Sequence, residues 1–89
     1  MKMSLGITPD GCETFRVDVG MRDVLRWERT VRGASMGRLA KPSAQDLYSL
    51  AWSACASREL FAGDLAAFEA ACEVDALHVD EEDPTNPVA

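Results

Sequence analysis

At 89 residues, 47% of them hydrophobic and 27% charged, the chain has the composition of one small globular domain, which excludes an intrinsically disordered protein. The net charge of −6 is unevenly distributed, because residues 1–41 carry eight Lys or Arg against five Asp or Glu, whereas residues 42–89 carry one Arg against ten acids. No segment approaches the roughly 18 consecutive apolar residues of a membrane span, and the start MKMSLG contains no long hydrophobic targeting segment, so we expect a soluble protein.

A β-hairpin is predicted over residues 2–19. Apolar residues alternate along two segments, as they do in strands: Met3, Leu5 and Ile7, then Phe15, Val17 and Val19. The intervening Thr8-Pro9-Asp10-Gly11 has the residue types that a turn requires. Because two strands alone are marginally stable in water, their apolar face must pack against helices.

An amphipathic helix is predicted over residues 21–32, ending near Gly33. Its apolar side contains Met21, Val24, Leu25, Trp27 and Val31. Glu28 lies within that apolar side, where it either pairs with Arg32 at i, i+4 or meets a partner group elsewhere. We expect the pair with Arg32.

Residues 33–42 (GASMGRLAKP) follow neither helical nor strand periodicity and are predicted to be a linker or a mobile loop. Two apolar residues lie within this segment, Met36 and Leu39. We expect them to fold back onto the core; the alternative is that they form part of a binding surface.

The central helix is predicted over residues 43–62. Ser43 and Asp46 have the spacing of a capping box, which marks its start. Apolar and small residues occupy most of its circumference, so it must be covered on more than one side. Trp52 can fill a large volume there if its indole N–H finds an acceptor.

A third helix is predicted over residues 64–76, with Asp64 as its N-cap and an apolar stripe made by Leu65, Phe68 and Cys72. Residues 80–89 (DEEDPTNPVA) combine acids with prolines and are expected to form a disordered acidic tail. The sequence therefore predicts a mainly α fold. In this prediction residues 1–79 form a single three-helix domain with an N-terminal β-hairpin.

We find no motif for catalysis or cofactor binding, since GxSxG, GxGxxG and P-loop patterns are missing. The three cysteines are odd in number and form no CxxC pair, which fits a reducing cytosol, and Cys55 and Cys72 lie on apolar helical faces as small hydrophobic residues. His78 has no second ligand at metal-binding spacing, and residues 80–83 lack the ladder of a calcium loop. We expect no enzymatic activity, no cofactor and no metal.

Three arginines, Arg22, Arg26 and Arg29, line one side of the first predicted helix and superficially suggest phosphate contacts. Asp23 shares that side, the chain as a whole is acidic, and no interleaved aromatic residues offer a stacking platform. We therefore expect no nucleic-acid binding. The arginines can instead receive an acidic partner or the acidic end of the chain itself.

The order of segments resembles the tail assembly chaperones of long-tailed bacteriophages, particularly of phages that infect actinobacteria. The resemblance covers roughly residues 17–89: RDVLRWERT, a glycine-bearing loop, PSAQDLYSLAWSACASREL, a short FEAAC helix and the acidic end DEEDPTNPVA. Its most specific parts are Trp27-Glu28, Leu50-Ala51-Trp52 and Phe68-Glu69. Residues 1–16, which include Cys12, match no pattern of that family.

The resemblance implies a non-enzymatic role in the host cytoplasm. A protein of this family binds the long helical tape-measure protein, keeps it soluble and helps tail-tube subunits assemble around it. Members often exist as a short form and a longer form made by a programmed frameshift, and this chain would be the short form. A homo-oligomer is compatible with this role.

The family supplies no motif for a contact surface, so the partner-binding residues are predicted from their apolar character alone: Trp27, Met36, Leu39 and Phe61. The alternative for all four is the core. Two other functions stay open, namely a small structural protein of the virion, such as a head–tail connector or tail-completion protein, and an acidic module that occupies another protein's basic surface.

Overall fold

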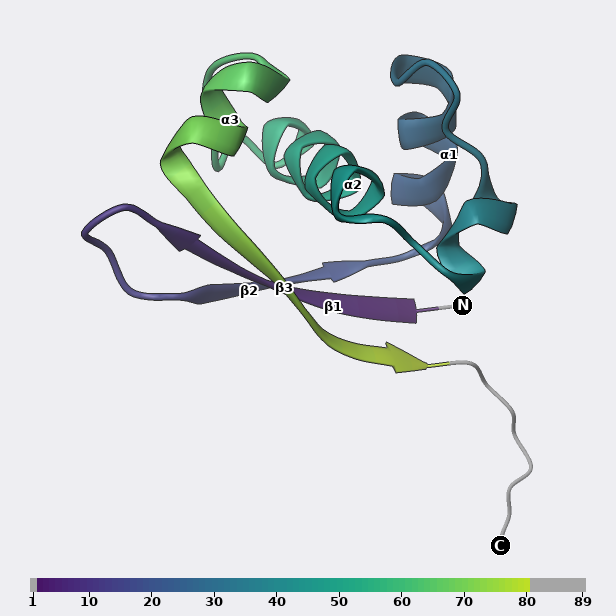
Figure 1. Cartoon of the computed structure of the whole chain (residues 1–89), viewed down its shortest axis with the longest axis horizontal. Helices are drawn as coiled ribbons and strands as arrows, with labels where there is room; N and C mark the ends of the chain where they lie inside the picture. Colours follow the sequence, from purple (N-terminus) through teal and green to yellow (C-terminus); the bar gives the residue numbers. More distant parts are fainter. Residues whose placement is uncertain (1, 81–89) are drawn as a thin grey trace, which may run out of the picture.

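The computed structural model describes residues 2–80 as one antiparallel sheet with helices packed on one of its faces (Figure 1). The elements in chain order are β1 (Lys2–Pro9), β2 (Phe15–Val19), α1 (Met21–Thr30), the short 3-10 helix η1 (Met36–Ala40), α2 (Ala44–Ser57), α3 (Leu65–Ala71) and β3 (Cys72–Asp80). The strand order is β2-β1-β3.

The predicted hairpin is confirmed. Strands β1 and β2 pair antiparallel with Met3 opposite Val19, Leu5 opposite Val17 and Ile7 opposite Phe15. In the turn, the amide of Cys12 donates to the carbonyl of Pro9 at 2.9 Å. Gly11 there has a φ of +75°, a conformation that glycine adopts without a Cβ clash.

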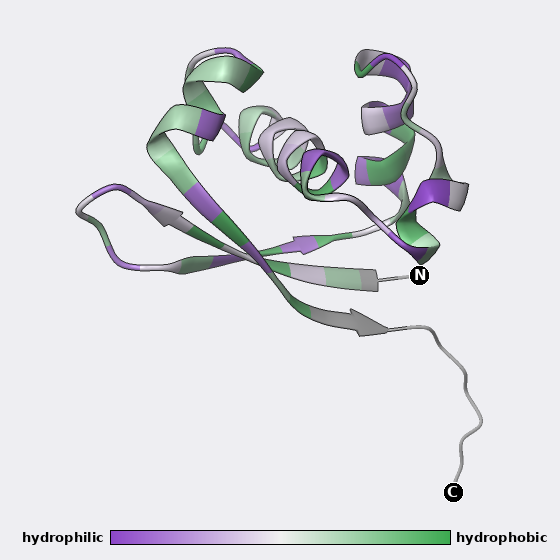
Figure 2. Cartoon of the chain, viewed as in Figure 1, coloured by the Kyte–Doolittle hydropathy of each residue, from purple (hydrophilic) through white to green (hydrophobic). Residues whose placement is uncertain are grey.

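The prediction of a mainly α fold is wrong, because the sheet has a third strand and the fold is mixed α and β. The predicted helix 64–76 stops at Ala71, and β3 begins at Cys72 and pairs antiparallel with β1. Hydrophilic and hydrophobic segments alternate along this strand (Figure 2), with Glu73 and Asp75 exposed and Val74 buried between them. The residues predicted to form an acidic tail lie outside the described residues, except Asp80, which belongs to β3.

A one-residue irregularity in β3 sets Leu77 apart from the core. Ser4 pairs with His78 and Leu5 with Ala76, so Leu77 is an extra residue opposite β1. A Cβ atom on Gly6 would lie 3.2 Å from the Cδ2 atom of Leu77, so glycine at this position gives Leu77 room. Leu77 remains 53% exposed and is not among the residues packed in the core.

The core lies between the sheet and the helices, and α2 is its central helix. It packs against α1, α3, β2 and β3, which explains why apolar and small residues cover so much of its circumference. The core residues buried most completely come from the strands and from all three α-helices: Met3, Leu5, Ile7, Val19, Val24, Trp27, Leu50, Cys55 and Phe68. The predicted role of α2 is therefore confirmed.

The predicted helix starts are confirmed, but the predicted ends of the central and third helices are wrong. Ser43 Oγ accepts from the amide of Asp46 at 3.1 Å, and Asp46 Oδ2 accepts from the amide of Ser43 at 3.0 Å. Asp64 Oδ1 accepts from the amide of Ala67 at 2.9 Å. The central helix, however, ends at Ser57 and does not reach residue 62.

The chain reverses after α2 through a Schellman motif. The amide of Leu60 donates to the carbonyl of Cys55 at 2.8 Å, and that of Glu59 donates to the carbonyl of Ala56 at 3.1 Å. Glu59 adopts a φ of +60°, the left-handed conformation that this motif needs and that glycine usually supplies. Because glutamate stands where glycine is expected, the sequence did not indicate this helix end.

Candidate functional site

The four residues predicted to bind a partner do not form one surface. Trp27 is fully buried and Leu39 is 6% exposed, so both belong to the core. Phe61 is partly buried, with its ring edge-on to that of Phe68 at a centroid distance of 5.1 Å. Met36 is 42% exposed and is the only one of the four that offers a large free surface.

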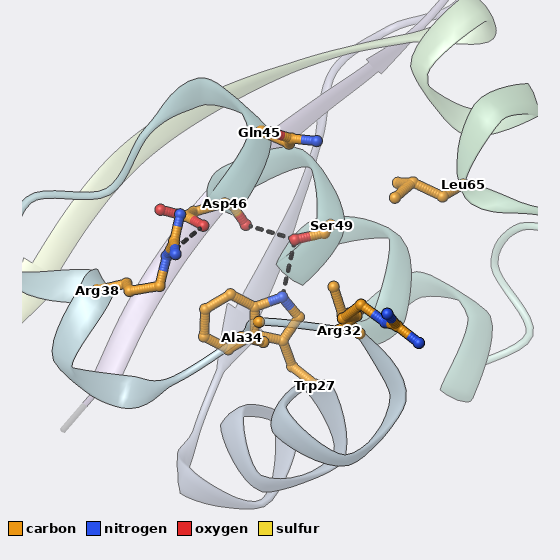
Figure 3. Close-up of a pocket in the computed structure, with 10 residues that line it drawn as sticks. Trp27, Arg32, Ala34, Arg38, Gln45, Asp46, Ser49 and Leu65 are labelled. Atoms are coloured by element: carbon orange, nitrogen blue, oxygen red, sulfur yellow. Dashed lines mark hydrogen bonds and ion pairs between the residues drawn. The ribbon is translucent and has the colours of Figure 1, made fainter.

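Trp27 belongs to a polar network beneath a small pocket of about 130 Å³ (Figure 3). Its indole Nε1 donates to Ser49 Oγ at 2.8 Å, and Ser49 Oγ donates to the carbonyl of Asp46 at 3.1 Å. Arg38 Nε donates to Asp46 Oδ1 at 3.1 Å. These bonds join α1 and η1 to the first two turns of α2, so these polar groups at the base of the pocket already stabilise the fold.

The Asp46 carboxylate in this network is stabilised in its charged form. Its pKa lies below the ordinary value because the backbone amide of Ser43 donates to it; burial opposes this shift, and the Ser43 hydroxyl and Arg38 reinforce it. At neutral pH it is ionised and both of its oxygens accept hydrogen bonds. A carboxylate held in this way caps a helix, and it is poorly suited to accept a proton in catalysis.

A second, partly buried ion pair connects the end of α2 to the start of α1. Arg58 Nη1 and Nη2 donate to the two carboxylate oxygens of Asp23 at 2.9 and 3.0 Å. Arg58 Nη2 also donates to the carbonyl of Asp18 at 2.8 Å, and Asp23 Oδ2 accepts from the amide of Gly20 at 2.9 Å. Burial raises the pKa of Asp23, but the bonds from Arg58 and Gly20 outweigh it and leave the pKa lowered.

Within residues 2–80, five large hydrophobic side chains are exposed, and three of them gather on the outer side of α1 and the adjacent η1. Met21 is 50% exposed, Leu25 45% and Met36 42%. They line a shallow hollow of about 210 Å³. A neighbouring hollow of about 410 Å³ shares Arg22 and Leu25 with it and adds Arg26 and Arg29. We call the surface formed by Met21, Arg22, Leu25, Arg26, Arg29 and Met36 the α1–η1 surface.

Glu28 holds Met36 beside α1. Its Oε2 accepts from the amide of Met36 at 2.6 Å, which satisfies a donor at the start of η1. The expected pair between Glu28 and Arg32 is not among the ion pairs formed by residues 2–80, so the alternative that Glu28 meets a partner group elsewhere is the one that the structure supports. Through this bond, a residue of the predicted loop becomes part of the α1–η1 surface.

The three arginines of this surface are less neutralised than the sequence indicated. Asp23 lies among them along the chain, yet it is only 8% exposed and its carboxylate is bound by Arg58, the residue that follows α2. Within residues 2–80, Arg22, Arg26 and Arg29 form no ion pair at hydrogen-bonding distance. The positive charge on the outer side of α1 is therefore available to a partner. The local sequence contains no indication of this, because Asp23 is neutralised by Arg58, which is 35 residues away.

The cysteines and the other titratable groups add no second site. Burial raises the pKa of Cys55 to about 11, and burial also raises that of Cys72, so both thiols are protonated and unreactive at neutral pH. Within residues 2–80, no group of His, Cys, Asp and Glu side chains has a metal-binding arrangement. The same part of the chain contains no helix long and apolar enough to span a membrane.

Comparisons with family models, with curated proteins and with solved structures find no match to this chain.

Proposed function

We propose that the protein is a phage tail assembly chaperone that binds the tape-measure protein in the host cytoplasm and assists assembly of the tail tube around it. The segment order quoted above supports this assignment. The observation that carries it is the α1–η1 surface, where exposed Met21, Leu25 and Met36 lie beside three arginines.

A surface of this composition suits a chaperone for a helical protein. Exposed apolar side chains on a small domain are costly unless a partner covers them, and methionine adapts to irregular apolar surfaces. Charged groups beside these apolar side chains keep the unbound protein in solution and guide the encounter with a partner. In contrast, the Trp27–Ser49 and Arg38–Asp46 bonds beneath the pocket and the Arg58–Asp23 pair are structural contacts.

Co-expression tests this proposal directly. The tape-measure protein of the same phage is produced alone and together with this protein, and the soluble fractions are compared. We expect the tape-measure protein to be insoluble alone and to become soluble, and to copurify, when both are present. Unchanged solubility in the presence of well-folded protein would show the proposed function to be wrong.

A small structural virion protein, the alternative considered above, gives a different result in finished particles. An assembly factor leaves the particle, whereas a head–tail connector or tail-completion protein stays in it. Mass spectrometry of purified virions should therefore detect none of its peptides. Peptides at a fixed stoichiometry to the other tail proteins would favour the structural role.

A further inference from the structure

We infer that the α1–η1 surface binds an amphipathic helix whose apolar stripe is flanked by acidic side chains. This inference rests on the proposed function and specifies two things that the proposal leaves open: which face of the chain makes the contact, and which charge the partner segment carries.

The apolar part of the surface is a continuous row. Met21 and Leu25 are one helical turn apart on α1, so their side chains lie on one side of it. Met36, which the bond to Glu28 holds in place, lines the same hollow. At 42 to 50% exposed, each of these side chains has apolar area left to bury. An apolar stripe on a partner helix, with anchors one turn apart, matches this row.

The charged part runs parallel to that row. Arg22, Arg26 and Arg29 follow the spacing i, i+4, i+7, which places them along one side of α1. The helix has 10 residues and is about 15 Å long, so two to three turns of a partner helix can lie alongside it. Acidic residues at the same spacing on that helix can each reach one guanidinium group, which forms paired hydrogen bonds with carboxylates.

A protein segment fits this surface better than a nucleic acid. Phosphates also attract arginines, but single-stranded nucleic acids bind through stacking on aromatic side chains, and none of the residues lining the two hollows is aromatic. The three exposed apolar side chains beside the arginines contribute to binding only if apolar groups cover them. An acidic amphipathic helix satisfies both parts of the surface at once.

The test uses two designed helical peptides of about 20 residues that share one leucine stripe. The first carries Glu along both sides of the stripe and the second carries Lys at the same positions. Binding to the purified full-length protein is measured by fluorescence anisotropy at low and at high salt. We expect the acidic peptide to bind at least tenfold more tightly than the basic one, and this difference to shrink at high salt because screening weakens exposed charge pairs.

Four variants locate the contact. Leu25→Asp is expected to reduce affinity for the acidic peptide at least tenfold, whereas Leu60→Asp, which changes a leucine of similar exposure (53%) outside this surface, is expected to change it less than twofold. Arg26→Glu should have the effect of Leu25→Asp, and Lys41→Glu provides the matched charge control. Circular dichroism and the melting temperature establish that each variant is folded before its affinity is interpreted.

Several outcomes would overturn the inference. They are equal affinity for the acidic and basic peptides, tighter binding of a single-stranded oligonucleotide than of the acidic peptide, and equal losses in the test and control variants. Sedimentation adds another: a dimer that Leu25→Asp dissociates would assign the surface to a second copy of this chain.

Failure of this inference differs from failure of the proposed function. If the wild-type protein keeps the tape-measure protein soluble and the Leu25→Asp and Arg26→Glu variants do so equally well, the function stands and the location is wrong. If the wild-type protein binds the acidic peptide but leaves the tape-measure protein insoluble, the surface stands and the proposed function is wrong.

Discussion

Asp23 and Arg58 connect three elements through one ion pair. Arg58 follows α2, Asp23 lies in the first turn of α1, and the carbonyl of Asp18 in β2 accepts from the same guanidinium group. The Asp23 side chain is 11% exposed and that of Arg58 is 37% exposed, so the pair is only partly screened by water. The pair should therefore contribute more to the stability of the fold than an ordinary surface ion pair does.

Replacing Asp23 by Asn should lower the free energy of unfolding by about 1–3 kcal/mol. The substitution keeps the size of the side chain but removes the charge and leaves the Arg58 guanidinium poorly compensated. Urea unfolding followed by circular dichroism measures the loss. Glu69→Gln, which neutralises an exposed carboxylate on α3, is the control and should change stability by less than about 0.5 kcal/mol.

Glu59 occupies a backbone conformation that costs an L-residue free energy. Because its φ is +60° at the residue after the α2 cap, Glu59→Gly should raise the free energy of unfolding by about 0.5–1 kcal/mol. Ala56→Gly, in the last turn of α2, is the control in which glycine replaces a residue with helical backbone. This substitution should lower the free energy of unfolding by about 1 kcal/mol. If Glu59→Gly destabilised the protein, the glutamate side chain would have a role that its backbone conformation does not reveal.

At the scale of whole elements, the sequence correctly predicts those features that are determined by residues close together in the chain. The hairpin, the capping box at Ser43 and the N-cap at Asp64 all follow from local patterns, and all three are present. The third strand was missed because Leu65, Phe68 and Cys72 also fit a helical stripe. What decides between helix and strand at Cys72 is the free edge of β1, a distant segment that the local pattern cannot reveal.

Strand β3 makes the hairpin a three-stranded sheet, and its inward side chains should therefore matter for stability. Val74 is 9% exposed and Leu77 53% exposed. Val74→Ala should lower the free energy of unfolding by about 1–2 kcal/mol, whereas Leu77→Ala should lower it by less than about 0.5 kcal/mol. Chemical denaturation of both variants measures the difference. Equal effects would argue that this strand does not pack against the helices as described.

At the scale of the whole molecule, the candidate site arises where elements meet. The local sequence placed Met36 in a linker or mobile loop and the three arginines on one side of the first helix together with Asp23, and it suggested Trp27 as a contact residue. Two long-range contacts change this assignment: Trp27 Nε1 donates to Ser49, which is 22 residues away, and Asp23 pairs with Arg58, which is 35 residues away. The first removes an aromatic side chain from the surface, and the second leaves an arginine-rich face on α1.

The same two networks determine how stability depends on pH. Asp23 and Asp46 both have pKa values below the ordinary 3.8, since hydrogen bonds and arginines stabilise their charged forms. A carboxyl group with a lowered pKa in the folded state binds fewer protons there than in the unfolded state. Its contribution is therefore present in full well above pH 3.8 and is lost as the pH falls through the folded-state value.

Urea unfolding of the wild-type protein between pH 6 and pH 2 should show stability falling most steeply below about pH 4. In the Asp23→Asn variant, stability should be lower at pH 6 but should fall less on acidification, because one of the two carboxyl groups with a lowered pKa is absent. The two curves should therefore approach each other near pH 2. Parallel curves would mean that the pKa of Asp23 is the same in the folded and unfolded states, and that the pair with Arg58 does not stabilise the charged carboxylate.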